Sequence, residues 1–187
     1  LANGGAASNI GQSTNAAANL VINGGTLLYT GPAVSTNRRF TIGASGGTID
    51  ASGTGTLAFT NTGSMATTGA GTRTLTLTGS GNGSLASAIV NQGGNATSLV
   101  KSGAGTWTLS GSSTYTGTTT INQGTISANK IVVGGGNSNL GNATSAVILG
   151  DAINKGTLSY TGNSATYTRG FTVNAGGGEV DVTTAGQ

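Results

Sequence analysis

Apolar and polar residues alternate along short stretches of the chain. Residues 72–78 read TRTLTLT and residues 106–109 read TWTL, so apolar side chains recur at every second position. Because neighbouring side chains of a β-strand point to opposite faces, this alternation predicts strands with one buried face. No apolar set recurs at helical spacing over three turns, and glycine interrupts almost every window. The pattern therefore predicts an all-β protein.

A long internal repeat relates the two ends of the chain. Residues 25–50 align without a gap with residues 156–181 after a shift of 131, and 13 of the 26 positions are identical. We place a first unit at 8–137 and a partial second unit at 138–187, within one continuous segment, 1–187. The chain stops inside a unit, and we expect it to be a piece of a longer repeat array.

The two copies indicate which positions face inward. Leu28 is replaced by serine in the second copy, whereas Leu27 and Tyr29 are unchanged. Since strand side chains alternate, we expect Leu27 and Tyr29 to point into the core and Leu28 to point outward. Phe40 and Ile42 form a second inward pair by the same parity.

A shorter period lies within the long unit. A glycine, a small residue and an apolar residue recur as a triplet roughly every 20 residues, about six times per unit. One such coil cannot bury its apolar face alone, whereas stacked coils bury a continuous column and pair their backbone amides. Glycine and asparagine suit the corners because both tolerate positive φ. The repeats predict a parallel β-helix, a solenoid with about 20 residues per coil.

The composition removes most catalytic chemistry. The chain has no His and no Cys, so it has no His-based acid/base or metal site, no disulfide and no zinc knuckle. Charged residues make up 6% of the chain, and its seven basic residues form no cluster that would follow a phosphate backbone. No apolar run approaches the ~18 residues of a spanning helix. We expect no cofactor, no nucleic-acid partner and no membrane insertion by this segment.

Residues 98–129 read SLVKSGAGTWTLSGSSTYTGTTTINQGTISAN. A Lys-x-Gly-x-Gly start is followed by a Thr-Tyr-x-Gly step, a Thr-rich strand and a Gly-Thr-apolar end. The residues that form this pattern are Lys101, Gly103, Gly105, Trp107, Leu109, Thr114, Tyr115, Gly117, Thr118, Thr119, Ile121, Gly124, Thr125 and Ile126. The segment resembles the autotransporter-associated β-strand repeat. The resemblance implies a right-handed β-helix in a secreted passenger region, displayed on or released from a bacterial cell, and it implies no catalytic residue.

The chain has four carboxylates, Asp50, Asp151, Glu179 and Asp181, which could serve a glycan-cleaving β-helix enzyme. Asp50 and Asp181 are repeat equivalents, which we expect about six coils or roughly 29 Å apart, beyond the spacing of a glycosidase pair. Glu179 and Asp181 share one strand face about 7 Å apart, but Thr48 replaces Glu179 in the first copy. We interpret these two carboxylates as part of a solvated strand face.

Two basic residues recur at a fixed distance from an acidic one. Arg38 precedes Asp50 by 12 residues, as Arg169 precedes Asp181. We expect surface ion pairs between neighbouring strands, each worth less than about 1 kcal/mol. Contact with a carbohydrate is the alternative, and it makes these four residues candidates for ligand contact.

Two aromatic residues of the 98–129 segment could stack on sugars. Trp107 shares a strand face with Leu109, so we expect it in the core. Tyr115 follows a predicted corner, where either a core position or contact with a ligand fits the sequence.

The leading hypothesis is a structural or adhesive repeat module of an extracellular bacterial surface protein, without enzymatic activity. We expect it to self-associate by axial stacking or through neighbouring repeats, in a fibre or a very long chain. One alternative is a glycan-binding or glycan-cleaving passenger domain that uses Glu179 and Asp181. Another is ice binding through Thr-x-Thr rows at 72–78, 106–108 and 118–120.

Overall fold

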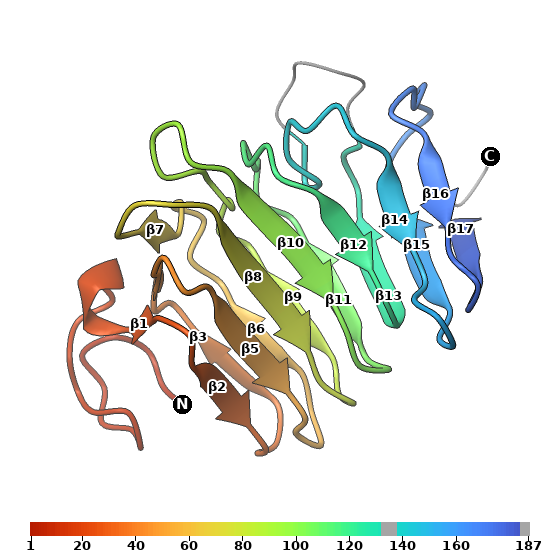
Figure 1. The fold of residues 1–187 in the computed structure, drawn as a ribbon. Helices are drawn as coiled ribbons and strands as arrows, with labels where there is room; N and C mark the ends of the chain where they lie inside the picture. Colours follow the sequence, from red (N-terminus) through yellow and green to blue (C-terminus); the bar gives the residue numbers. More distant parts are fainter. Residues whose placement is uncertain (132–137, 184–187) are drawn as a thin grey trace.

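The structure is a computed structural model that describes residues 1–131 and 138–183. The chain winds into a parallel β-solenoid whose strands lie side by side along its axis (Figure 1). Two long seven-stranded sheets form two sides, and a short three-stranded sheet forms part of a third side near the N-terminus. The only helix in the described residues is the single 3-10 turn Ala17–Asn19. The predicted all-β solenoid is confirmed.

Each coil contributes one strand to each long sheet. The first long sheet contains, in spatial order, β2 (Thr26–Tyr29), β5 (Gly47–Ala51), β8 (Arg73–Thr78), β10 (Thr97–Lys101), β12 (Thr119–Ile121), β14 (Val147–Leu149) and β16 (Phe171–Val173). The second contains β3 (Val34–Thr36), β6 (Leu57–Phe59), β9 (Gly83–Leu85), β11 (Thr106–Leu109), β13 (Gly124–Ala128), β15 (Gly156–Tyr160) and β17 (Gly178–Val182). The short sheet contains β1 (Val21–Ile22), β4 (Thr41–Ile42) and β7 (Ala66–Thr67).

The register between strands gives the length of each coil. In the second long sheet, partner residues are 19 positions apart from Thr106 to Thr125 and 32 positions apart from Thr125 to Thr157. Several coils lie close to the predicted 20 residues, such as the 20 from Val100 to Thr120 and the 22 from Thr26 to Thr48, and others are longer. The longer coils insert residues outside the strands, where an insertion leaves the ladder of parallel strands intact.

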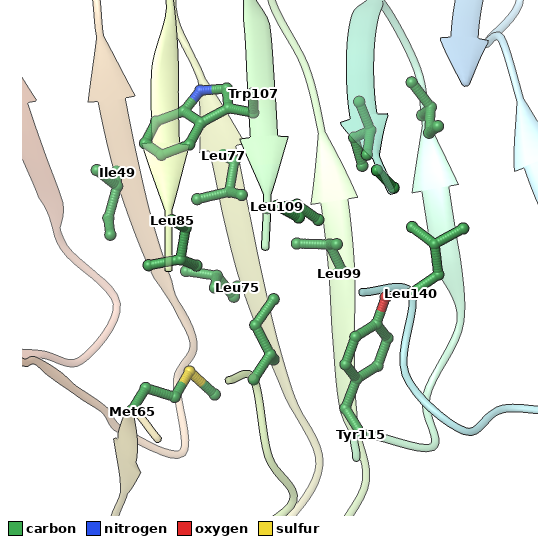
Figure 2. Close-up of a cluster of buried hydrophobic side chains, with 14 of the residues drawn as sticks. Ile49, Met65, Leu75, Leu77, Leu85, Leu99, Trp107, Leu109, Tyr115 and Leu140 are labelled. Carbon is green, nitrogen blue, oxygen red and sulfur yellow. The ribbon is translucent and has the colours of Figure 1, made fainter. Parts of the chain in front are cut away.

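The core fills the space enclosed by the sheets. Along β8 every second residue is buried, and Trp107 on β11 has no exposed surface. Figure 2 shows Trp107, Leu77 and Leu85 converging between the sheets. The predicted core position of Trp107 is confirmed.

The parity expected from the two copies also holds. Phe40 and Ile42 are fully buried, and Leu27 and Tyr29 pack against the core. Leu28, between the last two, is 57% exposed. Alternation along a strand therefore identified the buried face correctly at all five positions.

The last coil exposes apolar residues whose equivalents in the first copy are buried. Phe171 is 37% exposed and Val180 is 42% exposed, whereas Phe40 and Ile49, which occupy the same repeat positions, are fully buried. Phe40 contacts Phe59 of the following coil edge to face, with ring centroids 5.6 Å apart. Burial at a repeat position therefore depends on the neighbouring coil as well as on the residue itself.

This difference yields a test with the same residue type at the same repeat position. Phe40→Ala should lower the free energy of unfolding by about 3–5 kcal/mol, because it leaves a cavity in the core. Phe171→Ala should cost roughly a third of that or less, since its ring is already partly in water. Urea denaturation followed by circular dichroism measures both losses. Equal losses would contradict the observed difference in burial.

Candidate interaction surface

The outer face of the second long sheet is covered by small polar side chains. The β-ladder aligns these residues into two columns along the solenoid axis, with neighbours roughly 4.8 Å apart. One column contains Ser35, Ala58, Ser84, Thr108, Ser127, Ser159 and Asp181, in which only Ala58 lacks a polar side chain, and the other contains Thr106, Thr125, Thr157 and Glu179. Such a face offers hydroxyl groups that both donate and accept hydrogen bonds. It suits contact with a polar surface.

The outer face of the first long sheet is less uniform. Its central outward column contains Thr26, Thr48, Thr76, Val100, Thr120, Ile148 and Thr172. Val100 and Ile148 interrupt the threonines, so this sheet has no continuous Thr row of the kind that the ice-binding hypothesis needs. Ice binding stays a prediction without a structural feature that favours it.

Glu179 and Asp181 lie on β17, where Glu179 is exposed and Asp181 is partly buried. Lys155 Nζ lies 2.7 Å from a carboxylate oxygen of Glu179, and this is the only ion pair in residues 1–131 and 138–183. The hydrogen bond and the charge of Lys155 lower the pKa of Glu179. A general acid for glycoside cleavage requires a raised pKa, so the environment of Glu179 does not suit that role.

Arg38 and Asp50, expected as an ion pair, do not form one. The Arg38 side chain is buried and donates three hydrogen bonds to the N-terminal segment: to the carbonyl oxygens of Ala2 and Gly11, and to Ser13 Oγ. Asp50 lies on β5, where Ser52 Oγ donates to its carboxylate at 2.5 Å. The ion-pair prediction is wrong because the backbone carbonyls of the N-terminal segment already occupy the guanidinium.

Arg169 and Asp181 are not paired either. Arg169 donates to the carbonyl oxygens of Leu140 and Ser145, both at 2.7 Å. Asp181 lies on β17, in register with Ser159 of β15. The structure therefore leaves Asp50 and Asp181 on the outer faces and uses both arginines to hold backbone. Ligand contact by these four residues stays a prediction.

Tyr115 belongs to the core. Its side chain has no exposed surface, and its hydroxyl shares a 2.7 Å hydrogen bond with Thr119 Oγ1. Burial raises the pKa of Tyr115 well above its usual range. Ligand contact by Tyr115 stays a prediction that its burial does not favour, because no part of the side chain reaches the surface. With Trp107 also buried, neither aromatic residue proposed for sugar stacking is accessible.

Two further basic side chains, Arg73 and Lys101, are buried, and burial was predicted from the sequence for neither. Arg73 donates to the carbonyl oxygens of Ile42, Thr68, Gly69 and Gly71. The burial of Arg73 could have been predicted from the sequence, because Arg73 lies on the same strand face as the buried leucines of β8. Arg73 therefore ties the turn at 68–71 to β8 through its backbone carbonyls.

Lys101 plays the same part in the next coil. Its Nζ donates to the carbonyl oxygens of Ser102, Gly103 and Gln123, at 2.7, 2.6 and 3.1 Å. Gln123 belongs to the following coil, so Lys101 ties two successive corners together. The lysine that begins the 98–129 motif is a structural clamp.

The motif glycines allow these corners to stack closely. A Cβ on Gly105 would lie 1.8 Å from the carbonyl oxygen of Gly81, and one on Gly103 would lie 2.6 Å from that of Gly79. Gly103 also has φ of +69°, which disfavours other residues. The Lys-x-Gly-x-Gly spacing is thus explained by contact with the corner of the preceding coil.

Comparisons with known proteins agree with this geometry. Residues 99–128 match the family model of the passenger-associated transport repeat. The chain contains an autotransporter-associated repeat. The resemblance expected over residues 98–129 is confirmed, and so is an extracellular or cell-surface location.

One curated relative extends the similarity to most of the chain. The Adhesin BmaC autotransporter of Brucella suis biovar 1 (strain 1330) is 43% identical over 184 residues, which cover 94% of this chain. The chain spans 5% of that relative's length. No solved structure matches the chain. In the part of the chain that the structure describes, no helix is both long and apolar enough to cross a membrane.

The corner glycines can be tested with a matched pair. Gly105→Ala should destabilise the fold by roughly 1–3 kcal/mol, because its Cβ would overlap the preceding coil. Gly94→Ala is the control, since a Cβ there meets nothing within 4 Å, and it should be neutral or slightly stabilising. Urea denaturation measures both. A neutral Gly105→Ala would refute the close stacking of the corners.

The buried lysine predicts a pH dependence of stability. Burial lowers the pKa of Lys101 to about 8, whereas an unfolded lysine titrates near 10.4. Between these values the unfolded chain binds more protons, so stability should rise from pH 8 to about 10. Below pH 8 the lysine is protonated in both states and contributes no slope. Above about pH 10 the unfolded tyrosines also lose protons.

Lys101→Met should remove this rise while keeping an apolar stem in the same place. Lys155→Met, at an exposed lysine, should retain it. Urea midpoints of the three proteins at pH 7, 8, 9 and 10 provide the comparison. A rise of the same size in Lys101→Met would assign the pH dependence to another group.

Proposed function

We propose that this segment is a structural and adhesive repeat of a bacterial surface protein, which extends the passenger away from the cell and contacts polar surfaces. The observation that supports it best is the continuous pairing of seven strands in each long sheet. A parallel ladder of this kind makes a stiff rod, because each coil is hydrogen-bonded to the coils on both sides. The name of the relative, an adhesin, agrees with a role in attachment.

The contact surface that we propose is the outer face of the second long sheet. Its two columns of Ser and Thr repeat along the axis, and its only ion pair in the described residues lies near the last coil. Individual hydroxyl contacts are weak, but a repeated row engages many of them at once, which raises avidity. The proposed role needs no catalytic residue. The glycan-binding or glycan-cleaving alternative stays a prediction that no feature of the described surface favours.

Attachment can be measured with beads that carry the chain. Beads coated with the purified protein should adhere to cultured epithelial cells more than beads coated with albumin. Thr108→Arg places a bulky cation in the centre of the hydroxyl column and should reduce adhesion several-fold. Thr62→Arg is the matched control, because Thr62 is exposed between β6 and β7, away from that column.

Circular dichroism should confirm that both variants keep the fold. Equal adhesion of both variants and the unchanged protein would reject the second long sheet as the contact surface. Absence of adhesion by the unchanged chain would reject the adhesive part of the proposal.

A further inference from the structure

The two copies of the long repeat use the same local pairing. In the first copy Thr26 of β2 lies opposite Thr48 of β5, and in the second Thr157 of β15 lies opposite Glu179 of β17. The two residues of each pair are 22 positions apart in the sequence. The shift of 131 relates Thr26 to Thr157 and Thr48 to Glu179. The two units also begin alike, because Ser8 and Ser138 each donate a side-chain hydrogen bond to the carbonyl oxygen three residues later. The repeat is therefore structural as well as sequential.

The two copies nevertheless occupy different sides of the solenoid. β2 and β5 belong to the first long sheet, whereas their equivalents β15 and β17 belong to the second. β4 belongs to the short sheet, whereas its equivalent β16 belongs to the first long sheet. Every equivalent strand has moved by one side in the direction in which the chain winds. In Figure 1, β2 and β15 accordingly lie in different rows of strands.

The lengths of the coils account for this rotation. From Thr26 to Ile148, at the same position of the first long sheet, the chain completes five coils in 122 residues (148 minus 26). The remaining nine residues of the 131-residue shift carry it from β14 to β15, on the next side. Asp50 and Asp181, which the sequence predicts to lie about six coils apart, are therefore not stacked along one sheet. They face outward from different sheets.

We infer that successive 131-residue units present the same outward residues one side further round the solenoid axis, so that an array presents these residues in three directions. This rests on the proposed adhesive function. The residues retained between the copies include Thr26, Thr30 and Asp50, which become Thr157, Thr161 and Asp181. A rod built in this way presents these outward residues to a polar host surface in any orientation about its own axis. A repeat of whole coils would confine these residues to one side.

Engineered disulfides in this chain test the rotation directly. Partner residues of neighbouring parallel strands are close enough for a disulfide, and the chain has no native cysteine to interfere. The double variant Ser127→Cys/Ser159→Cys joins β13 to β15 within the second long sheet and should oxidise readily. Thr120→Cys/Ser159→Cys should stay reduced, because β12 belongs to the first long sheet. Mass spectrometry after mild oxidation gives both yields.

The pair Ser159→Cys/Asp181→Cys is the internal control, because these residues face each other whichever side the second unit occupies. Its oxidation shows that β15 is folded and reactive. Oxidation of Thr120→Cys/Ser159→Cys would overturn the rotation. So would a reduced Ser127→Cys/Ser159→Cys pair in a protein whose control pair oxidises. Neither result depends on adhesion, so failure of the inference and failure of the proposed function are distinguishable.

Discussion

The fold depends on the backbone hydrogen bonds between successive coils. The inner strands of the long sheets pair with strands of the coils before and after them. A single coil has few backbone hydrogen bonds within itself, so it is stable only in a stack. That dependence explains the composition. Close stacking requires glycine at corners such as Gly105, and it brings the backbone of successive corners together. The buried Lys101 and Arg73 then donate hydrogen bonds to corner carbonyls.

The few charges of the chain therefore lie in two kinds of position, buried and outward. Arg38, Arg73 and Lys101 are buried and hold backbone carbonyls, whereas Asp50, Glu179 and Asp181 lie on the outer faces of the long sheets. The outer faces of the long sheets are left mainly with hydroxyl groups. The second long sheet repeats these hydroxyl groups along the axis, which suits a rod that makes many weak contacts. The same interactions that build the solenoid thus leave it with a surface suited to attachment.

The fold could be predicted from the sequence because strand parity is a local property. Alternation identified the buried face at Phe40, Ile42 and Trp107, and the 98–129 motif identified the family. The candidate contacts were harder to predict. The arginines are placed by carbonyl oxygens far along the chain, and the burial of Tyr115 depends on packing between coils. The repeat distance of 131 also does not show on which side of the solenoid the second copy lies, because that side depends on the summed lengths of coils that differ in length.

Amide hydrogen exchange resolved by residue tests the dependence on stacking most directly. If each coil is stabilised by its two neighbours, protection should be highest in the central strands β8 to β12. In this 187-residue segment taken on its own, it should decrease towards β2 at one end and β17 at the other, because the terminal coils of the segment then have a neighbour on one side only. Equal protection along the whole axis, or the highest protection in the terminal coils, would contradict the account.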